Sequence, residues 1–163
     1  MMLKVNKNIL YYEFRFSHLS TNKVGNKVSP HKPLLLLSVI DLIEKGIIYS
    51  PIIELSDALV DAFERNSNIY VSGIEHFKHS LGMPFFYMRS EPFWELILMV
   101  DGTHQKTTVV STLRKHYKYA VIDQQLFELL SKPDASQQLR HVLIKTYLEN
   151  KKSRLVMISF QND

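Results

Sequence analysis

The sequence contains no cysteine, which excludes disulfide bonds, thiolate nucleophiles and cysteine-bound zinc or iron–sulfur clusters. It contains only five glycines, and they form no glycine-rich phosphate loop. No segment approaches the roughly 20 apolar residues that a membrane span needs, and the first residues lack the apolar run of a secretion signal. We therefore expect a soluble cytoplasmic protein with no membrane partner.

The composition that remains is that of an ordinary globular protein. The chain has 163 residues, of which 45% are hydrophobic and 22% are charged, and it has no low-complexity tract. This length suits a single domain with a proper core. We expect the folded domain to span residues 1–150, with residues 151–163 as a tail or truncated linker.

The charged residues are distributed in blocks, although the formal net charge is only +4. Residues 1–33 contain six basic residues against one acid, whereas residues 41–64 contain six acids against one lysine. Residues 102–122 contain four basic residues and no acid, and residues 140–154 contain five against one. Such segregation favours a polyanionic partner such as DNA, and a solvated basic surface is the alternative.

The strongest structural signal is the segment "SPHKPLLLLSVIDLIEKG". Proline suits the first position of a helix and glycine suits the position just past its end, so Pro33 and Gly46 bound a predicted helix over 33–45. Apolar residues lie nearly all round its first turns. This pattern predicts the central buried helix of the fold.

The start of the same helix is a candidate anion-binding site. In a helix that begins at Pro33, the N–H groups of Leu34 and Leu35 have no intrahelical partners and point outward with the positive end of the helix dipole. His31 and Lys32 flank these groups, and such a helix start binds phosphate readily. The alternative is that His31 only caps the helix while Lys32 points to solvent.

The predicted fold class is α+β, mainly helical. Apolar spacing and capping residues predict further helices at 6–20, after Ser56, at 107–118, at 123–131 behind Asp123, and at 134–150 behind Asp134. Residues 20–33 are expected to form an extended loop. Aromatic and β-branched residues predict strands at 84–89 and 93–100, which would form a small antiparallel β-hairpin near 84–100.

The sequence gives little support for catalysis. His76 and His79 in "HFKH" would lie on one face of a helix, but the nearby acids Glu75 and Glu91 form no zinc signature with them. The acidic set of a metal-dependent nuclease is also missing, and a Ser-His-Asp triad cannot be recognised. We therefore expect a binding module rather than an enzyme, with no catalytic residue, metal or cofactor.

A second informative segment is "GMPFFYMRSEPFW". Together with "PHKPLLLLSVIDLIEKG" before it and "LRHVLIKTYLEN" after it, it resembles the DNA sulfur-binding domain that precedes the HNH nuclease in modification-dependent restriction endonucleases. The resemblance covers about residues 8–150. It implies a double-stranded DNA partner carrying a phosphorothioate, in which sulfur replaces one non-bridging backbone oxygen.

The resemblance also implies a site. The family places a His-Arg pair and an aromatic-Pro pair around a shallow sulfur-binding dent, and the matching residues here are His31, Lys32, Met83 and Pro84, with Tyr87 nearby. Lysine replaces the frequent arginine at position 32, and methionine replaces the frequent tyrosine at position 83. The wall of the dent is therefore expected to be softer than in the family.

Discrimination at such a dent has a physical basis. Sulfur is larger, more polarizable and less strongly hydrated than oxygen, so it loses little hydration against Pro84 and Met83. An ordinary phosphate oxygen would lose its water there without gaining a hydrogen bond. The dent therefore selects sulfur largely by penalising oxygen. Expected contacts to neighbouring phosphates are Lys23, Lys27, Arg89, Ser90, Arg114, Lys115 and Lys118.

The sequence is also compatible with other functions and partners. No His-Asn-His nuclease motif follows residue 150, so we expect either a truncated protein or a free-standing reader that works with an HNH nuclease or other restriction subunit. The segment "GMPFFY" would instead serve as an aromatic cage in a reader of another modification, such as a methylated base. In a protein-interaction module, the apolar hairpin face would dock a partner subunit and the basic blocks would be solvated.

Overall fold

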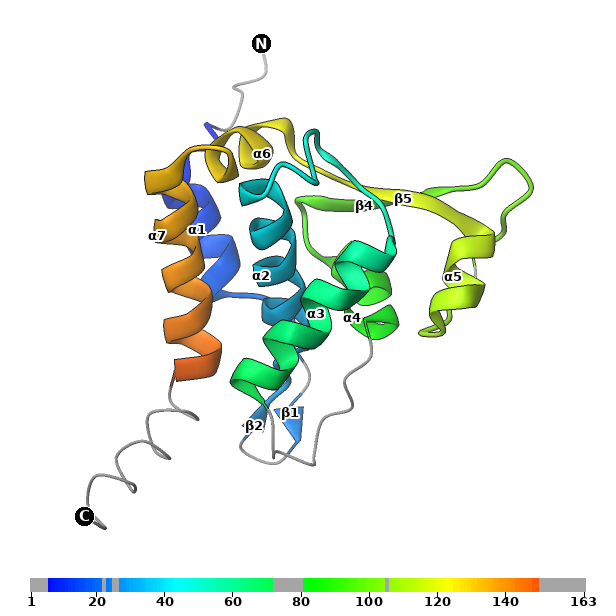
Figure 1. Cartoon of the computed structure of the whole chain (residues 1–163), viewed down its shortest axis with the longest axis horizontal. Coiled ribbons are helices and arrows are strands. Elements are labelled where there is room, and N and C mark those ends of the chain that lie inside the picture. Colours follow the sequence, from blue (N-terminus) through cyan, green and yellow to red (C-terminus); the bar gives the residue numbers. More distant parts are fainter. Residues whose placement is uncertain (1–5, 22, 25–26, 72–80, 105, 150–163) are drawn as a thin grey trace.

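The computed structural model describes residues 6–21, 23–24, 27–71, 81–104 and 106–149. Helices form most of it, and a small antiparallel sheet lies on one side (Figure 1). Helix α2 (His31–Glu44) is central, with α1 (Ile9–Ser17) and α7 (Pro133–Leu143) on one side and α3 (Asp57–Tyr70) on the other. The predicted α+β, mainly helical class is confirmed.

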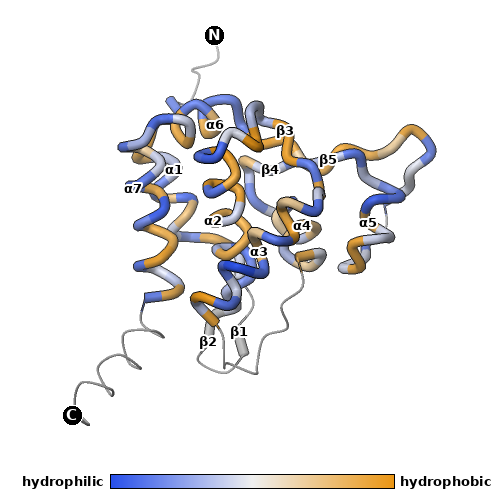
Figure 2. Tube along the Cα trace, in the orientation of Figure 1, coloured by the Kyte–Doolittle hydropathy of each residue, from blue (hydrophilic) through white to orange (hydrophobic). Residues whose placement is uncertain are grey.

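Helix α2 is the core of the molecule, as its sequence predicts. Every residue from His31 to Ile40 is buried, and Figure 2 shows the hydrophobic colour concentrated on the inner helices. The helix begins two residues earlier than expected, so Pro33 occupies its third position and Leu34 N–H donates to the Pro30 carbonyl at 3.0 Å. The prediction that Leu34 offers a free N–H to an anion is therefore wrong.

Gly46 ends α2 as predicted. It adopts φ +74°, a left-handed conformation that favours glycine. The N–H groups of Gly46 and Ile47 donate to the carbonyls of Ile43 at 3.0 Å and Leu42 at 2.9 Å, which satisfies the last turn in a Schellman motif.

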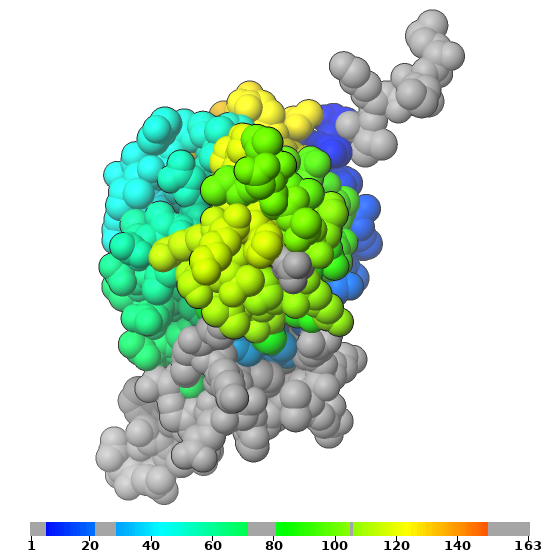
Figure 3. All heavy atoms as spheres, turned by 90° about the vertical axis from the view of Figure 1, so that its right-hand side faces the viewer, coloured from blue at the N-terminus to red at the C-terminus, as the bar shows by residue number. Residues whose placement is uncertain are grey.

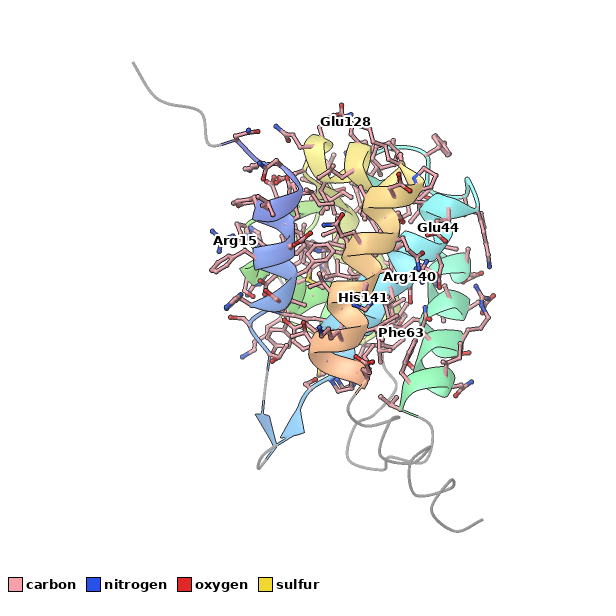
Figure 4. The ribbon with its side chains drawn as sticks, turned by 90° about the vertical axis from the view of Figure 1, so that its left-hand side faces the viewer. Arg15, Glu44, Phe63, Glu128, Arg140 and His141 are labelled. Carbon is pink, nitrogen blue, oxygen red and sulfur yellow. The ribbon has the colours of Figure 1, made fainter. Side chains whose placement is uncertain are left out.

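Ion pairs join α7 to α2. Arg140 of α7 reaches Asp41 at 2.7 Å and Glu44 at 3.0 Å, and Figure 4 shows Arg140 and Glu44 between the two helices. Burial opposes the charge of Arg140, but the two carboxylates outweigh it and raise the pKa of its guanidinium. A π-helical turn, η2 (Ile144–Leu148), continues α7.

The capping predictions have mixed outcomes. Ser56 caps α3 through a 3.1 Å bond from the Leu59 N–H, as expected. Asp123 precedes α6 (Gln124–Leu130) but makes no cap hydrogen bond, because its carboxylate accepts from the Tyr12 hydroxyl at 2.7 Å. Lys132, not Asp134, is the residue at the N-cap of α7.

The sheet differs from the predicted hairpin. Its strands are β3 (Ile52–Ile53), β4 (Trp94–Leu98) and β5 (Tyr117–Ile122), in the antiparallel order β3-β5-β4. Strand β4 confirms the second predicted strand, but residues 84–89 are helical, in α4 (Gly82–Tyr87) and the 3₁₀ turn η1 (Met88–Ser90). The expected hairpin partner of β4 is therefore wrong, and β5 takes its place.

The predicted helix at 107–118 is only partly confirmed. Helix α5 (Val110–His116) occupies its middle, and β5 begins directly after it at Tyr117. Ala120 and Ile122 of β5 are buried with the less buried Val121 between them, as expected for a strand with one buried face. Tyr117 is also buried, beyond the irregularity where the pairing with β4 shifts. The expected loop at 20–33 contains a short antiparallel pair, β1 (Lys23–Val24) with β2 (Lys27–Val28). No helix in the described part is long and apolar enough to cross a membrane.

Candidate functional site

Helix α4 is held in place by a close backbone approach at its first residue. A Cβ atom added to Gly82 would lie 1.8 Å from the carbonyl oxygen of Thr108, far inside van der Waals contact. Beyond this glycine, Phe85 and Phe86 are each 1% exposed and anchor the helix in the core. The remaining face of α4, with Met83, Pro84 and Tyr87, is directed into a pocket.

This pocket has a volume of about 460 Å³ and lies where α4, the start of α2 and the segment after α1 meet. Its lining residues are Ser20, Thr21, Ser29, His31, Lys32, Met83, Pro84, Tyr87 and Ser90. The five residues matched by the resemblance, which are distant in sequence, therefore surround one concavity.

The residues that line the pocket are of two chemical kinds. Met83, Pro84 and Tyr87 supply apolar surface from α4, and Tyr87 is 37% exposed. Ser20, Thr21, Ser29 and Ser90 supply hydroxyl groups. Phe85 and Phe86 belong to the core, so Tyr87 is the one Phe, Tyr or Trp among the described residues that line the pocket. The "GMPFFY" segment therefore forms no aromatic cage there.

The floor of the pocket contains a buried ion pair that joins α2 to the end of η1. Lys32 Nζ lies 2.7 Å from Glu91 Oε2, and the two side chains are 7% and 5% exposed. Lys32 also donates to Ser90 Oγ at 2.9 Å. The alternative in which Lys32 points to solvent is therefore wrong. Lys32 lies in the first turn of α2 and lines the pocket, and Glu91 compensates its charge.

The carboxylate of Glu91 bonds to three residues that line the pocket. Besides Lys32, its Oε2 accepts from the Ser20 backbone N–H at 3.0 Å and from Ser90 Oγ at 3.4 Å. These bonds satisfy a buried charge that would otherwise be costly. They connect the segment after α1, the start of α2 and the turn η1.

Tyr147 of η2 also holds the segment after α1, through hydrogen bonds to its backbone. Its hydroxyl donates to the Phe16 carbonyl at 2.7 Å and accepts from the Leu19 N–H at 2.9 Å. Burial raises the pKa of Tyr147, the Leu19 N–H opposes this rise, and the charge of Glu91 adds to it. The backbone that leads into the pocket wall is thereby held between Tyr147 and Glu91.

His31 is oriented by a neighbour in the pocket. Its Nδ1 lies 2.7 Å from Ser29 Oγ, and the residue is only 5% exposed. Such a contact fixes the ring plane of an imidazole. His31 therefore presents a defined edge to the pocket rather than a mobile side chain.

The predicted phosphate-contact residues are scattered around this pocket. Ser90 lines it, and Arg89 is exposed with its guanidinium 4.2 Å from the centre of the Phe86 ring. Lys23 and Lys27 belong to the paired strands β1 and β2, beside the chain that enters α2.

The other three predicted contacts lie on the arm formed by β4, α5 and β5, which projects from the body in Figure 1 and faces the viewer in Figure 3. Lys115 and Lys118 are exposed there. Arg114 is engaged instead, since it bonds the Leu55 carbonyl at 2.9 Å and Asp57 at 3.0 Å. Arg114 is itself exposed, so this surface pair leaves its predicted phosphate contact a prediction.

Metal chemistry finds no support in the described part of the chain. No group of three or more histidine and acidic side chains gathers there in a metal-binding arrangement. The His76 and His79 pair lies outside the residues that the structure describes.

Sequence reasoning missed the role of Glu91 and the pocket hydroxyls of Ser20, Thr21 and Ser29. It places Glu91 only among the acids near His76 and His79, although Glu91 directly follows the predicted contact Ser90. A buried acid next to a predicted cationic site is the signal that could have indicated an ion pair with Lys32.

No family model and no curated protein matches this chain. Among solved structures, the chain is similar to the sulfur binding domain of SprMcrA complexed with phosphorothioated DNA, with a TM-score of 0.64. The two chains are 14% identical, and the match covers 86% of this chain and 85% of that chain. This likeness supports the sequence resemblance at the level of the fold.

Proposed function

We propose that this chain is a non-catalytic module that binds duplex DNA and recognises a phosphorothioate linkage in the pocket between α2 and α4. The observation that carries the proposal is the meeting of His31, Lys32, Met83, Pro84 and Tyr87 around one concavity. The shared fold with a domain complexed with phosphorothioated DNA adds support. As with such domains, an HNH nuclease or other restriction subunit would act on the DNA that this module binds.

The chemistry of the pocket favours sulfur over oxygen. The wall of Met83 and Pro84 offers contact without hydrogen bonds, and a phosphate oxygen placed there would lose hydration without compensation. Sulfur is a weak hydrogen-bond acceptor, so it forfeits less at the same wall. The serine and threonine hydroxyls of the pocket can hold the oxygens of the same or the next linkage.

A gel-shift titration of matched duplexes, with and without one phosphorothioate, tests the proposal. We expect at least about tenfold tighter binding of the modified duplex at physiological salt, which corresponds to about 1.4 kcal/mol. Only one of the two phosphorus diastereomers should show the gain, because a duplex docked in one orientation directs one non-bridging position at Pro84. Equal affinity for all three duplexes would refute sulfur recognition.

The exposed lysines of the arm should contribute affinity without discrimination. We expect Lys115→Ala combined with Lys118→Ala to weaken both modified and unmodified DNA about tenfold, and to lower the salt dependence of binding by about two released ions. Fluorescence anisotropy at several salt concentrations measures both quantities.

A matched control places the same two changes at Lys45 and Lys132, which are exposed near the end of α2 opposite to His31. This variant should bind as the wild type does. If salt leaves the complex intact, or the arm variant binds normally, the basic arm is not a phosphate contact. A protein-interaction module would then account better for the surface.

A further inference from the structure

We propose that Glu91 is a specificity-determining residue, which rejects ordinary DNA by neutralising Lys32 at the floor of the pocket. This inference rests on the proposed function, because it concerns how the same pocket tells sulfur from oxygen. It assigns a role to an acid that is not among the residues lining the pocket but pairs with Lys32, which is.

The geometry makes the ion pair tight and internal. The two charged atoms are 2.7 Å apart, and neither side chain exceeds 7% exposure. Water therefore screens the pair little, and the attraction is stronger than at the surface. Among the lysines, arginines and acids that the structure describes, Lys32 alone lines the pocket. With Glu91 in place, the cationic group seen from the pocket carries a compensated charge.

A compensated lysine affects oxygen and sulfur differently. A phosphate oxygen that enters the pocket must lose water. An uncompensated ammonium would offset this desolvation cost with a charge-assisted hydrogen bond. Two of the three ammonium hydrogens already point to Glu91 and Ser90, and the field of the carboxylate opposes a second anion. Sulfur depends less on such a hydrogen bond because it is a weak acceptor. The pair thus lowers affinity for ordinary phosphate more than for phosphorothioate.

Changing the charge while keeping the shape isolates this effect. Glu91→Gln retains an oxygen that can accept from the Ser20 N–H, and it leaves Lys32 with an uncompensated positive charge. Lys32→Gln leaves a negative charge instead. The double variant Lys32→Gln with Glu91→Gln restores a pocket floor without net charge. The series therefore contains charges of +1, −1 and 0 at one place.

The experiment measures dissociation constants of these variants for the modified and unmodified duplexes at one salt concentration, by fluorescence anisotropy. For E91Q we expect about tenfold tighter binding of unmodified DNA and no more than about threefold tighter binding of modified DNA. The preference for sulfur should therefore fall several-fold. K32Q should weaken both duplexes, and the double variant should keep most of the wild-type preference.

Glu95→Gln is the matched control, because Glu95 lies on β4, is exposed, and changes the net charge of the protein equally. It should leave the preference unchanged. If E91Q does not fold, as judged by circular dichroism, the comparison of K32Q with the double variant decides. The unpaired Glu91 carboxylate of K32Q should repel a phosphate oxygen at least as strongly as the neutral floor of the double variant does, so a double variant that discriminates clearly better than K32Q would overturn the inference.

The outcomes separate this inference from the proposed function. If the wild-type protein shows no preference for sulfur, the proposed function itself fails. If the wild type prefers sulfur and folded E91Q keeps the same ratio of affinities, sulfur recognition stands and the role of Glu91 is refuted. If E95Q lowers the ratio as much as E91Q does, the effect is one of net charge and the inference is also refuted.

Discussion

Replacing Pro84 by aspartate is expected to abolish the preference for phosphorothioate DNA and to weaken binding of the modified duplex by at least about 100-fold. The substitution places a hydrated anion where the apolar wall would receive sulfur. Aspartate is well tolerated in the first turn of a helix, so α4 should persist. Isothermal titration calorimetry of both duplexes measures the change.

Two controls separate repulsion from the loss of the apolar wall. Pro84→Asn has nearly the shape of the aspartate variant but no charge, and it should remove the preference while weakening overall binding less. Pro92→Asp adds the same charge at an exposed proline just beyond the pocket-lining Ser90, and it should leave the ratio of affinities intact. If P84D and P84N both still prefer sulfur, Pro84 does not form the discriminating wall.

Gly82→Ala is expected to destabilise the protein by about 3 kcal/mol, a large effect for one added methyl group. The new Cβ would meet the Thr108 carbonyl carbon at 2.6 Å as well as its oxygen, so the start of α4 and the backbone at Thr108 must move apart. Urea unfolding followed by tryptophan fluorescence measures the loss, because Trp94 is buried and packs against Phe85 of α4. Sulfur preference should fall too, since α4 carries the wall.

Gly46→Ala is a comparison in which the loss of stability comes from backbone conformation and not from a steric clash. Nothing lies within 4 Å of a Cβ at Gly46, so the cost there comes only from its φ of +74° and should be about 1 kcal/mol. Because this glycine ends α2 at the pole opposite to His31, DNA binding should be unaffected. Equal costs at the two glycines would mean that α4 moves away from Thr108 without strain.

The parts of the fold that sequence predicts well are those with local causes. The run from Leu34 to Leu37 leaves no polar face, so its helix has to be buried, and the glycine at position 46 suits the left-handed turn that follows. Ser56 caps α3 for the same reason, because its hydroxyl bonds a backbone group three residues away. Such features need no knowledge of distant segments.

The errors arise where tertiary contacts decide the conformation. Residues 84–89 contain aromatic side chains that favour strands, yet the anchoring of Gly82 against Thr108 and the burial of Phe85 and Phe86 hold them as a helix. The first two residues of β5, Tyr117 and Lys118, are predicted as the end of a helix because "LRKHYKYA" is locally ambiguous. Its pairing with β3 and β4, both distant in sequence, determines its conformation.

The candidate site shows the same division. The resemblance located the residues of the pocket wall, but it did not indicate the ion pair of Lys32 with Glu91. These two residues are 59 positions apart in sequence, and their contact depends on how η1 packs against α2. A sequence gives the charge of each residue and not whether that charge is already satisfied. For this reason the sequence did not indicate that Lys32 has a buried partner, or that Arg114 has an exposed one.

The π-helical turn η2 has a consequence for the pocket, because the wider winding at Ile144–Leu148 sets the direction in which Tyr147 points. Each residue of a helix advances by about 100°, so deleting exposed Lys145 or Thr146 would swing the phenol away from Phe16 and Leu19. The chain ahead of Ser20 would then lose its rear support, although no residue of the concavity had changed. The rotation of Tyr147 about the helix axis, which one residue in η2 determines, thus affects the shape of a pocket formed by residues distant in sequence.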